Sequence, residues 1–117
     1  MTTTQRVIVQ QNNDETLQAT ITDHDSVPSD NVMNITGMQL DLYIKSTKET
    51  PDSDPSTVHL STTTGEITLT DPTHGVARIF VARAHLQTAG TLWYKLDVLS
   101  GGQLKTSGNG PFTVAAQ

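Results

Sequence analysis

The sequence contains no cysteine, so neither a disulfide framework nor a thiolate metal site can hold the fold together. It is also poor in basic residues, because seven Lys plus Arg stand against twelve Asp plus Glu and give a formal net charge of −5. This balance argues against binding nucleic acid or an anionic membrane. No apolar run approaches the roughly 20 residues needed to span a bilayer. Met1–Gln5 lacks the features of a secretory signal, so we expect no cleaved leader.

The residues that are abundant favour β-structure. Twenty residues are Thr, and no long mixture of Ala, Leu, Glu and Lys is present to favour a helix. A chain of 117 residues is long enough to bury one core. We therefore predict an all-β protein with a flexible N-terminal arm over residues 1–5 and a single domain over residues 6–117.

Alternation of apolar and polar residues marks the expected strands. The clearest is Met38–Ser46, where Met38, Leu40, Leu42 and Ile44 share one face. Other strands are expected around Val7–Val9, Leu17–Ile21, Val58–Leu60, Ile67–Leu69, Val76–Val81, Leu92–Leu99 and Phe112–Val114. This spacing predicts a β-sandwich of about seven to nine short antiparallel strands.

The connections between the strands carry turn chemistry. Residues 23–37 are expected to form a long irregular loop, and Lys48–Pro55 a solvated connection with two prolines. Asp71–Gly75 should reverse the chain. We expect one helical turn over Arg83–Gln87 that Gly90 ends, and Pro111 should lie on an edge strand or at a bulge.

The order of these features resembles a known phage family. It is carried by Thr20-Ile21-Thr22-Asp23, Pro28, Ile35-Thr36-Gly37, Ile67-Thr68-Leu69-Thr70-Asp71-Pro72, Gly75-Val76-Ala77, Leu86, Ala89-Gly90, Trp93-Tyr94 and Phe112-Thr113-Val114. From about Arg6 to Val114 the chain resembles the immunoglobulin-like N-terminal domain of phage baseplate upper proteins and related single-domain virion proteins. Ser26 and Asp30–Met33 depart from the family's pattern. The resemblance is therefore weakest in the first long loop.

The resemblance implies a non-enzymatic structural protein of the virion, made in the host cytoplasm. Its expected partners are other virion proteins, either of the capsid, as a decoration or cement protein, or of the baseplate and tail. A homo-oligomer is a further expectation. A carbohydrate-binding or host-adhesion module is the alternative, although one Trp, two Tyr and two Phe make a thin platform for sugars.

Four residues form the predicted interface. Trp93 is out of phase with the inward residues of its strand, and Tyr43 is out of phase with those of its own strand. If the two strands are neighbours, as in immunoglobulin-like sandwiches, both rings share an outer face with Lys95 and could anchor a partner. Phe80 makes its strand apolar on both sides. The competing interpretation is that the N-terminal segment or the Lys48–Pro55 loop covers the Trp93 ring.

The sequence contains no recognisable catalytic or metal-binding pattern, and we expect that the protein is not an enzyme. The histidines His24, His59, His74 and His85 are too scattered for a metal site and are interpreted as surface loop residues. Asp23-His24-Asp25 and Asp52-Ser53-Asp54 could supply carboxylates to a structural calcium ion, but neither follows the calcium-loop pattern. The simpler interpretation is that these Asp residues cap turns, so no cofactor is expected.

Overall fold

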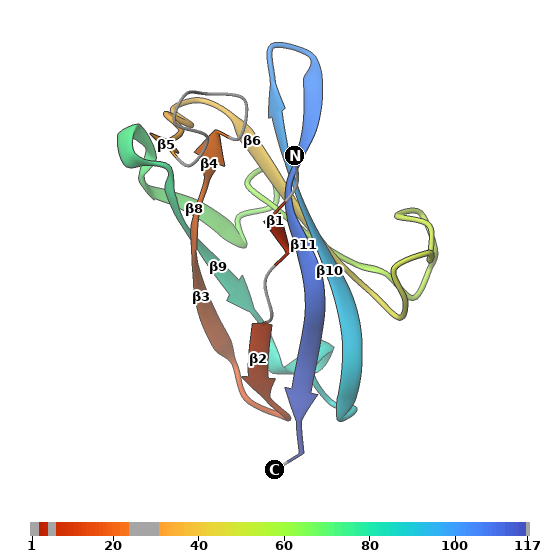
Figure 1. Ribbon diagram of the computed structural model, residues 1–117. Coiled ribbons are helices and arrows are strands. Elements are labelled where there is room, and N and C mark those ends of the chain that lie inside the picture. The colour runs from red at the N-terminus through yellow and green to blue at the C-terminus, as the bar shows by residue number, and fades with distance from the viewer. Residues whose placement is uncertain (1–2, 5–6, 24–30, 117) are drawn as a thin grey trace.

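The protein consists mainly of two β-sheets packed face to face (Figure 1). The structure is a computed structural model, and it describes residues 3–4, 7–23 and 31–116. The larger sheet has the order β1-β11-β10-β6-β7, and β2 also pairs with β11. Its strands are β1 (Thr3–Thr4), β2 (Val7–Gln10), β6 (Gln39–Lys45), β7 (Val58–Ser61), β10 (Gly90–Ser100) and β11 (Gln103–Ala115). The smaller sheet has the order β3-β9-β8, with β3 (Glu15–Thr20), β9 (Val76–Val81) and β8 (Ile67–Asp71). A separate short pair joins β4 (Thr22–Asp23) to β5 (Asn31–Val32).

The predicted all-β sandwich is confirmed. Eight of the described strands have four or more residues, within the range expected from the sequence. In the smaller sheet, the consecutive strands β8 and β9 pair with each other, and β3, from much earlier in the chain, pairs with β9. The larger sheet differs from the prediction in one respect, because β1 and β2 pair parallel with β11.

Alternation along the strands builds the core between the sheets. Leu40, Leu42 and Ile44 of β6 are buried, as are Tyr94, Leu96 and Val98 of β10, on the faces that the sequence predicted. Ala77, Ile79 and Val81 of β9 close the core from the smaller sheet. Burying such side chains stabilises a fold by about 1.5–3 kcal/mol each. The positions of these apolar residues along each strand therefore decide which of its two sides faces outward.

The turn between β8 and β9 requires its glycine. As predicted, Asp71–Gly75 reverses the chain, through a 3-10 helix over Pro72–His74 that Gly75 caps with a φ of 73°. A Cβ atom on Gly75 would lie 2.6 Å from the carbonyl oxygen of Ile21 and 2.8 Å from that of Met33. Because both contacts are with backbone, the turn fits against the end of β3 only without a side chain.

Several connections differ from the sequence-based expectation. The expected strand Phe112–Val114 is the end of β11, which begins at Gln103 and pairs with β10 across a register shift near Leu96 and Asp97. Pro111 is not on an edge strand. It lies between Gly108–Asn109, which pair with β1, and Phe112–Ala115, which pair with β2.

The expected helical turn is a 3-10 helix over Arg83–His85, and Gly90 begins β10 rather than ending that turn. In the expected loop over residues 23–37, β4 and β5 form a short antiparallel pair. Pro28, Ser26 and His24 fall outside the described residues, as does Asp25 of the segment Asp23-His24-Asp25 considered for calcium. Of the predicted arm over residues 1–5, Thr3–Thr4 are described and pair with β11. None of the helical turns in the described part of the chain is long and apolar enough to cross a membrane.

Candidate docking surface

Three of the four predicted interface residues meet on the outer face of the larger sheet. Tyr43 lies directly opposite Lys95 across the pairing of β6 with β10, and Trp93 lies opposite Lys45. Tyr43, Lys95 and Trp93 are all partly exposed. Phe80 is 44% exposed but lies on β9, so it belongs to the outer face of the smaller sheet, on the other side of the sandwich.

The connection over residues 46–57 covers part of this outer face. Figure 1 shows it projecting from the side of the larger sheet that faces away from β3, β8 and β9. Lys48 Nζ lies 5.5 Å from the centre of the Trp93 ring, which is a cation–π contact. Asp52 reaches back to Lys45 Nζ and Lys95 Nζ, at 2.5 Å each. The loop therefore folds across the face, as the competing interpretation held, although it leaves Trp93 partly exposed.

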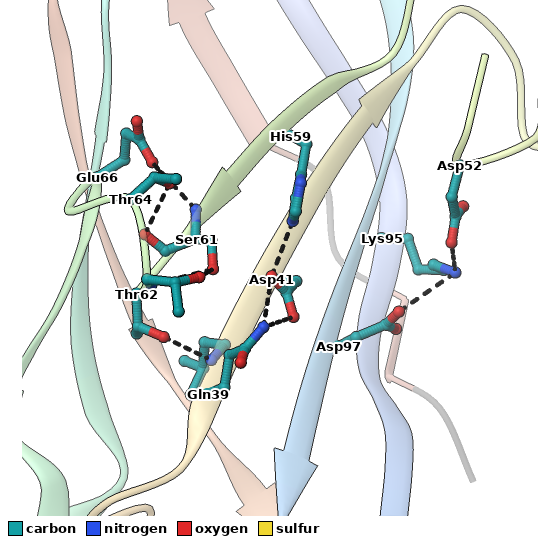
Figure 2. Close-up of polar contacts among 12 residues, drawn as sticks. Gln39, Asp41, Asp52, His59, Ser61, Thr62, Thr64, Glu66, Lys95 and Asp97 are labelled. Carbon is teal, nitrogen blue, oxygen red and sulfur yellow. Dashed lines mark hydrogen bonds and ion pairs between the residues drawn. The ribbon is translucent and has the colours of Figure 1, made fainter.

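Buried charges anchor the loop to the sheet. Lys45 and Asp97 are 6% and 1% exposed, although both lie on the outward face of their strands. Lys95 Nζ lies between the carboxylates of Asp52 and Asp97, 3.3 Å from the latter (Figure 2). Burial lowers the pKa of Lys95, but its hydrogen bonds and attraction to these carboxylates outweigh burial and raise it. The three groups form a linear network whose charges already have partners.

A second polar cluster lies beside the first, on β6 and β7. His59 Nε2 lies 2.8 Å from Asp41 Oδ1, and Gln39 Nε2 donates to Asp41 Oδ2 at 3.0 Å (Figure 2). The rings of Tyr43 and His59 stack with centroids 4.6 Å apart and an interplanar angle of 6°. Burial raises the pKa of Asp41, but hydrogen bonds, above all the one with His59, outweigh burial and lower it.

The Asp41–His59 pair is two thirds of a catalytic triad in composition, but its geometry differs. A triad of the Ser-His-Asp type requires a hydroxyl that hydrogen-bonds to the imidazole. The nearby Ser61 hydroxyl instead pairs with that of Thr63 at 2.6 Å, and the Ser61 backbone N–H donates to Glu66. The cluster orients Tyr43 and positions a partly exposed aromatic surface.

His74 and the loop carboxylate Asp54 have local partners. His74 contacts Asp71 within the β8–β9 turn, and His59 lies on a strand rather than in the expected loop. Asp54 accepts hydrogen bonds from the backbone N–H and hydroxyl of Ser56, which is the turn-capping role proposed from the sequence. No group of three metal-ligating side chains gathers among the residues that the structure describes.

Two further residues on this face were not singled out from the sequence. Ile8 is 57% exposed and alternates with the inward Val9, so it points outward opposite Thr113 of β11. Leu104 is 62% exposed and pairs with Leu99, which is in phase with Trp93. In Figure 1 the β10–β11 hairpin extends beyond the rest of the sandwich. An exposed aliphatic side chain therefore lies toward each end of β11 on the outer side of the sheet.

The outer face of the smaller sheet is open by comparison. Around Phe80 there is a shallow depression of about 480 Å³, lined also by Arg78, Thr16 and Thr68. All four side chains are exposed. The two outer faces of the sandwich therefore differ in kind, since one carries buried ion pairs and a covering loop and the other is a bare surface rich in hydroxyl groups.

Comparison of the chain with models of known protein families finds no match. No curated protein matches it either.

Proposed function

We propose that this chain is a non-enzymatic structural protein of a phage particle that docks on neighbouring virion subunits through the outer face of its larger sheet. The phage setting rests on the sequence resemblance. The docking face rests on one observation: partly exposed aromatic rings are held in fixed positions by neighbours on two strands and one loop. Rings fixed in advance lose little conformational entropy when a partner binds.

The mechanism is shape-complementary contact with little electrostatic cost. Lys45, Lys95 and Asp97 already have ionic partners within the face. A subunit that covers them therefore leaves none of these charges buried without a partner. The aromatic rings supply the central contact, and Ile8 and Leu104 supply apolar contacts toward the two ends. We favour a decoration, cement or small accessory protein of the capsid, with a baseplate or tail component as the alternative.

Mass spectrometry of purified particles tests this role. On the order of hundreds of copies per particle indicates capsid decoration, whereas about six or twelve copies indicates the tail machinery, because each count follows from the symmetry of its assembly. Particles that lack the chain altogether contradict the virion role.

A matched pair of variants tests the docking face. We expect Trp93→Ala to fold and to lose at least tenfold in affinity for particles that lack the native chain, because the central ring contact is removed. Phe80→Ala is the control, since it removes an exposed aromatic ring from the opposite face. Equal binding by the two variants contradicts the assignment, and circular dichroism confirms that each is folded.

Carbohydrate binding has a distinct signature. Lys48 lies over the Trp93 ring, on which a sugar would have to stack. Glycan-array binding that is lost in Trp93→Ala would favour the adhesion function over docking on a virion subunit.

A further inference from the structure

Strand β3 forms an edge of the smaller sheet, because β9 is its one partner in the described sheet. Just beyond β3, the Ile21 N–H donates to the Gly75 carbonyl at 2.8 Å, which fixes the alternation of antiparallel hydrogen bonds. Glu15, Leu17 and Ala19 therefore bond to β9. The backbone N–H and C=O groups of Thr16, Gln18 and Thr20 face away from it.

The far side of β9 confirms this phase. The Phe80 N–H donates to the Glu66 carbonyl at 2.9 Å, so even-numbered residues of β9 bond toward β8 and odd-numbered ones toward β3. The outward groups of β3 are thus a regular row of donors and acceptors, which is the template that another strand recognises.

The other edges of the two sheets are less suitable templates. β8 carries a register shift between Leu69 and Asp71, and a bulge of that kind disrupts pairing. β2 and β7 have four residues each. β3 has six, with no proline, and no charge from Thr16 to Thr20. Among the described edges it is therefore the longest regular and uncharged one.

We propose that β3 is a self-association site, at which two copies of this chain pair antiparallel about a two-fold axis at Gln18. In that register Gln18 faces its own counterpart, and Thr16 faces Thr20 of the second copy. All three outward-facing residues of each copy then pair, giving about six hydrogen bonds at two per residue pair. The two smaller sheets become one continuous sheet.

A second copy fits this edge better than an unrelated strand does, because the row is self-complementary about its centre. Leu17 and Ala19, half-buried in the single chain, face Ala19 and Leu17 of the second copy and gain cover. The two Glu15 side chains lie at opposite ends of the paired strands. Pairing therefore brings no like charges together along β3, although each copy carries a net negative charge. This site is separate from the proposed docking face and does not depend on the virion role.

Charge substitutions at Gln18 test the register. We expect wild-type protein to form dimers as its concentration rises in sedimentation velocity. Gln18→Lys and Gln18→Glu should each weaken dimerisation at least tenfold, because like charges then lie directly opposite each other. An equimolar mixture of the two variants should regain dimers as the Lys–Glu heterodimer. Thr68→Lys, on the same outer face but on β8, is the control and should dimerise as the wild type does.

Amide hydrogen exchange gives a second readout that needs no substitution. In dilute protein Leu17 and Ala19 should be protected and Thr16, Gln18 and Thr20 should exchange fast, whereas at high concentration all five should be protected. The proposal is overturned by a wild type that stays monomeric at millimolar concentration, by a dimer that Gln18→Lys leaves unchanged, or by a charge-swapped mixture that stays monomeric.

Discussion

The two outer faces of the sandwich arise from the same alternation of side chains but have different properties. On the larger sheet, the connection over residues 46–57 returns across the face and places Asp52 between two lysines. On the smaller sheet, the short turn between β8 and β9 covers nothing of the outer face, so Arg78 and Phe80 remain exposed. Alternation therefore decides which side chains point outward, whereas the connections decide whether those side chains meet solvent.

The largest expected difference between the faces concerns stability. Asp97→Ala should lower the free energy of unfolding by about 2 kcal/mol, because it deprives Lys95 of a buried ionic partner. Arg78→Ala, an exposed residue of the other face, should change it by less than about 0.5 kcal/mol. Urea denaturation measures both, and similar losses would mean that the two faces do not differ in this way.

A smaller effect is expected at the loop that covers the face. Asp52→Ala should cost about 1 kcal/mol, because the carboxylate is partly exposed and its ion pairs are screened by solvent. The loop over residues 46–57 should also become more susceptible to limited proteolysis, since Asp52 ties it to β6 and β10. Asp54→Ala, which removes a contact within the loop alone, is the matched control. If the two variants are cleaved at the same rate, Asp52 does not clamp the loop.

The smallest expected effect is on the pH dependence of stability, to which carboxylates on the outer face of the larger sheet contribute. Burial raises the pKa values of Asp41 and Asp52, but hydrogen bonds with His59 and with Lys45 and Lys95 outweigh it and lower them below 3.8. A lowered pKa in the folded state adds stability above pH 3.8, and that stability is lost as the pH falls through 3.8 toward the folded-state value.

Asp41→Asn should therefore flatten the decline in stability below about pH 4. Unfolding followed by circular dichroism at several pH values measures this slope. The exposed Arg78→Ala variant should keep the wild-type slope. A wild-type slope in Asp41→Asn as well would show that this carboxylate does not contribute to acid unfolding.

The sequence predicts the parts of the fold that depend on local alternation. Met38–Ser46 and Leu92–Leu99 contain enough in-phase apolar residues to assign Tyr43, Trp93 and Lys95 to the outward side before any pairing is known. Residues 103–111 lack that signal, because two glycines and a proline interrupt the apolar rhythm. They are nevertheless in β11, since β10 supplies hydrogen-bond partners along almost its whole length.

The candidate site was predictable only in part, because local alternation says nothing about contacts between distant segments. Phe80 has the outward phase of an interface residue, but alternation does not say which sheet its strand joins. The contacts of Asp52 with Lys45 and Lys95 join a loop to two strands, and only the folded loop brings them together. Ile8 and Leu104 are single apolar residues next to polar or inward positions, so they carry no pattern that would single them out.

The position of Trp93 gives the protein an internal optical reporter. Because it is the chain's one tryptophan, its fluorescence comes from a single indole on the outer face of the larger sheet. Release of Lys48 from the ring would move the emission toward longer wavelengths, and burial under a bound subunit would move it toward shorter ones. The opening of the loop and the covering of the face can thus be followed without attaching a label.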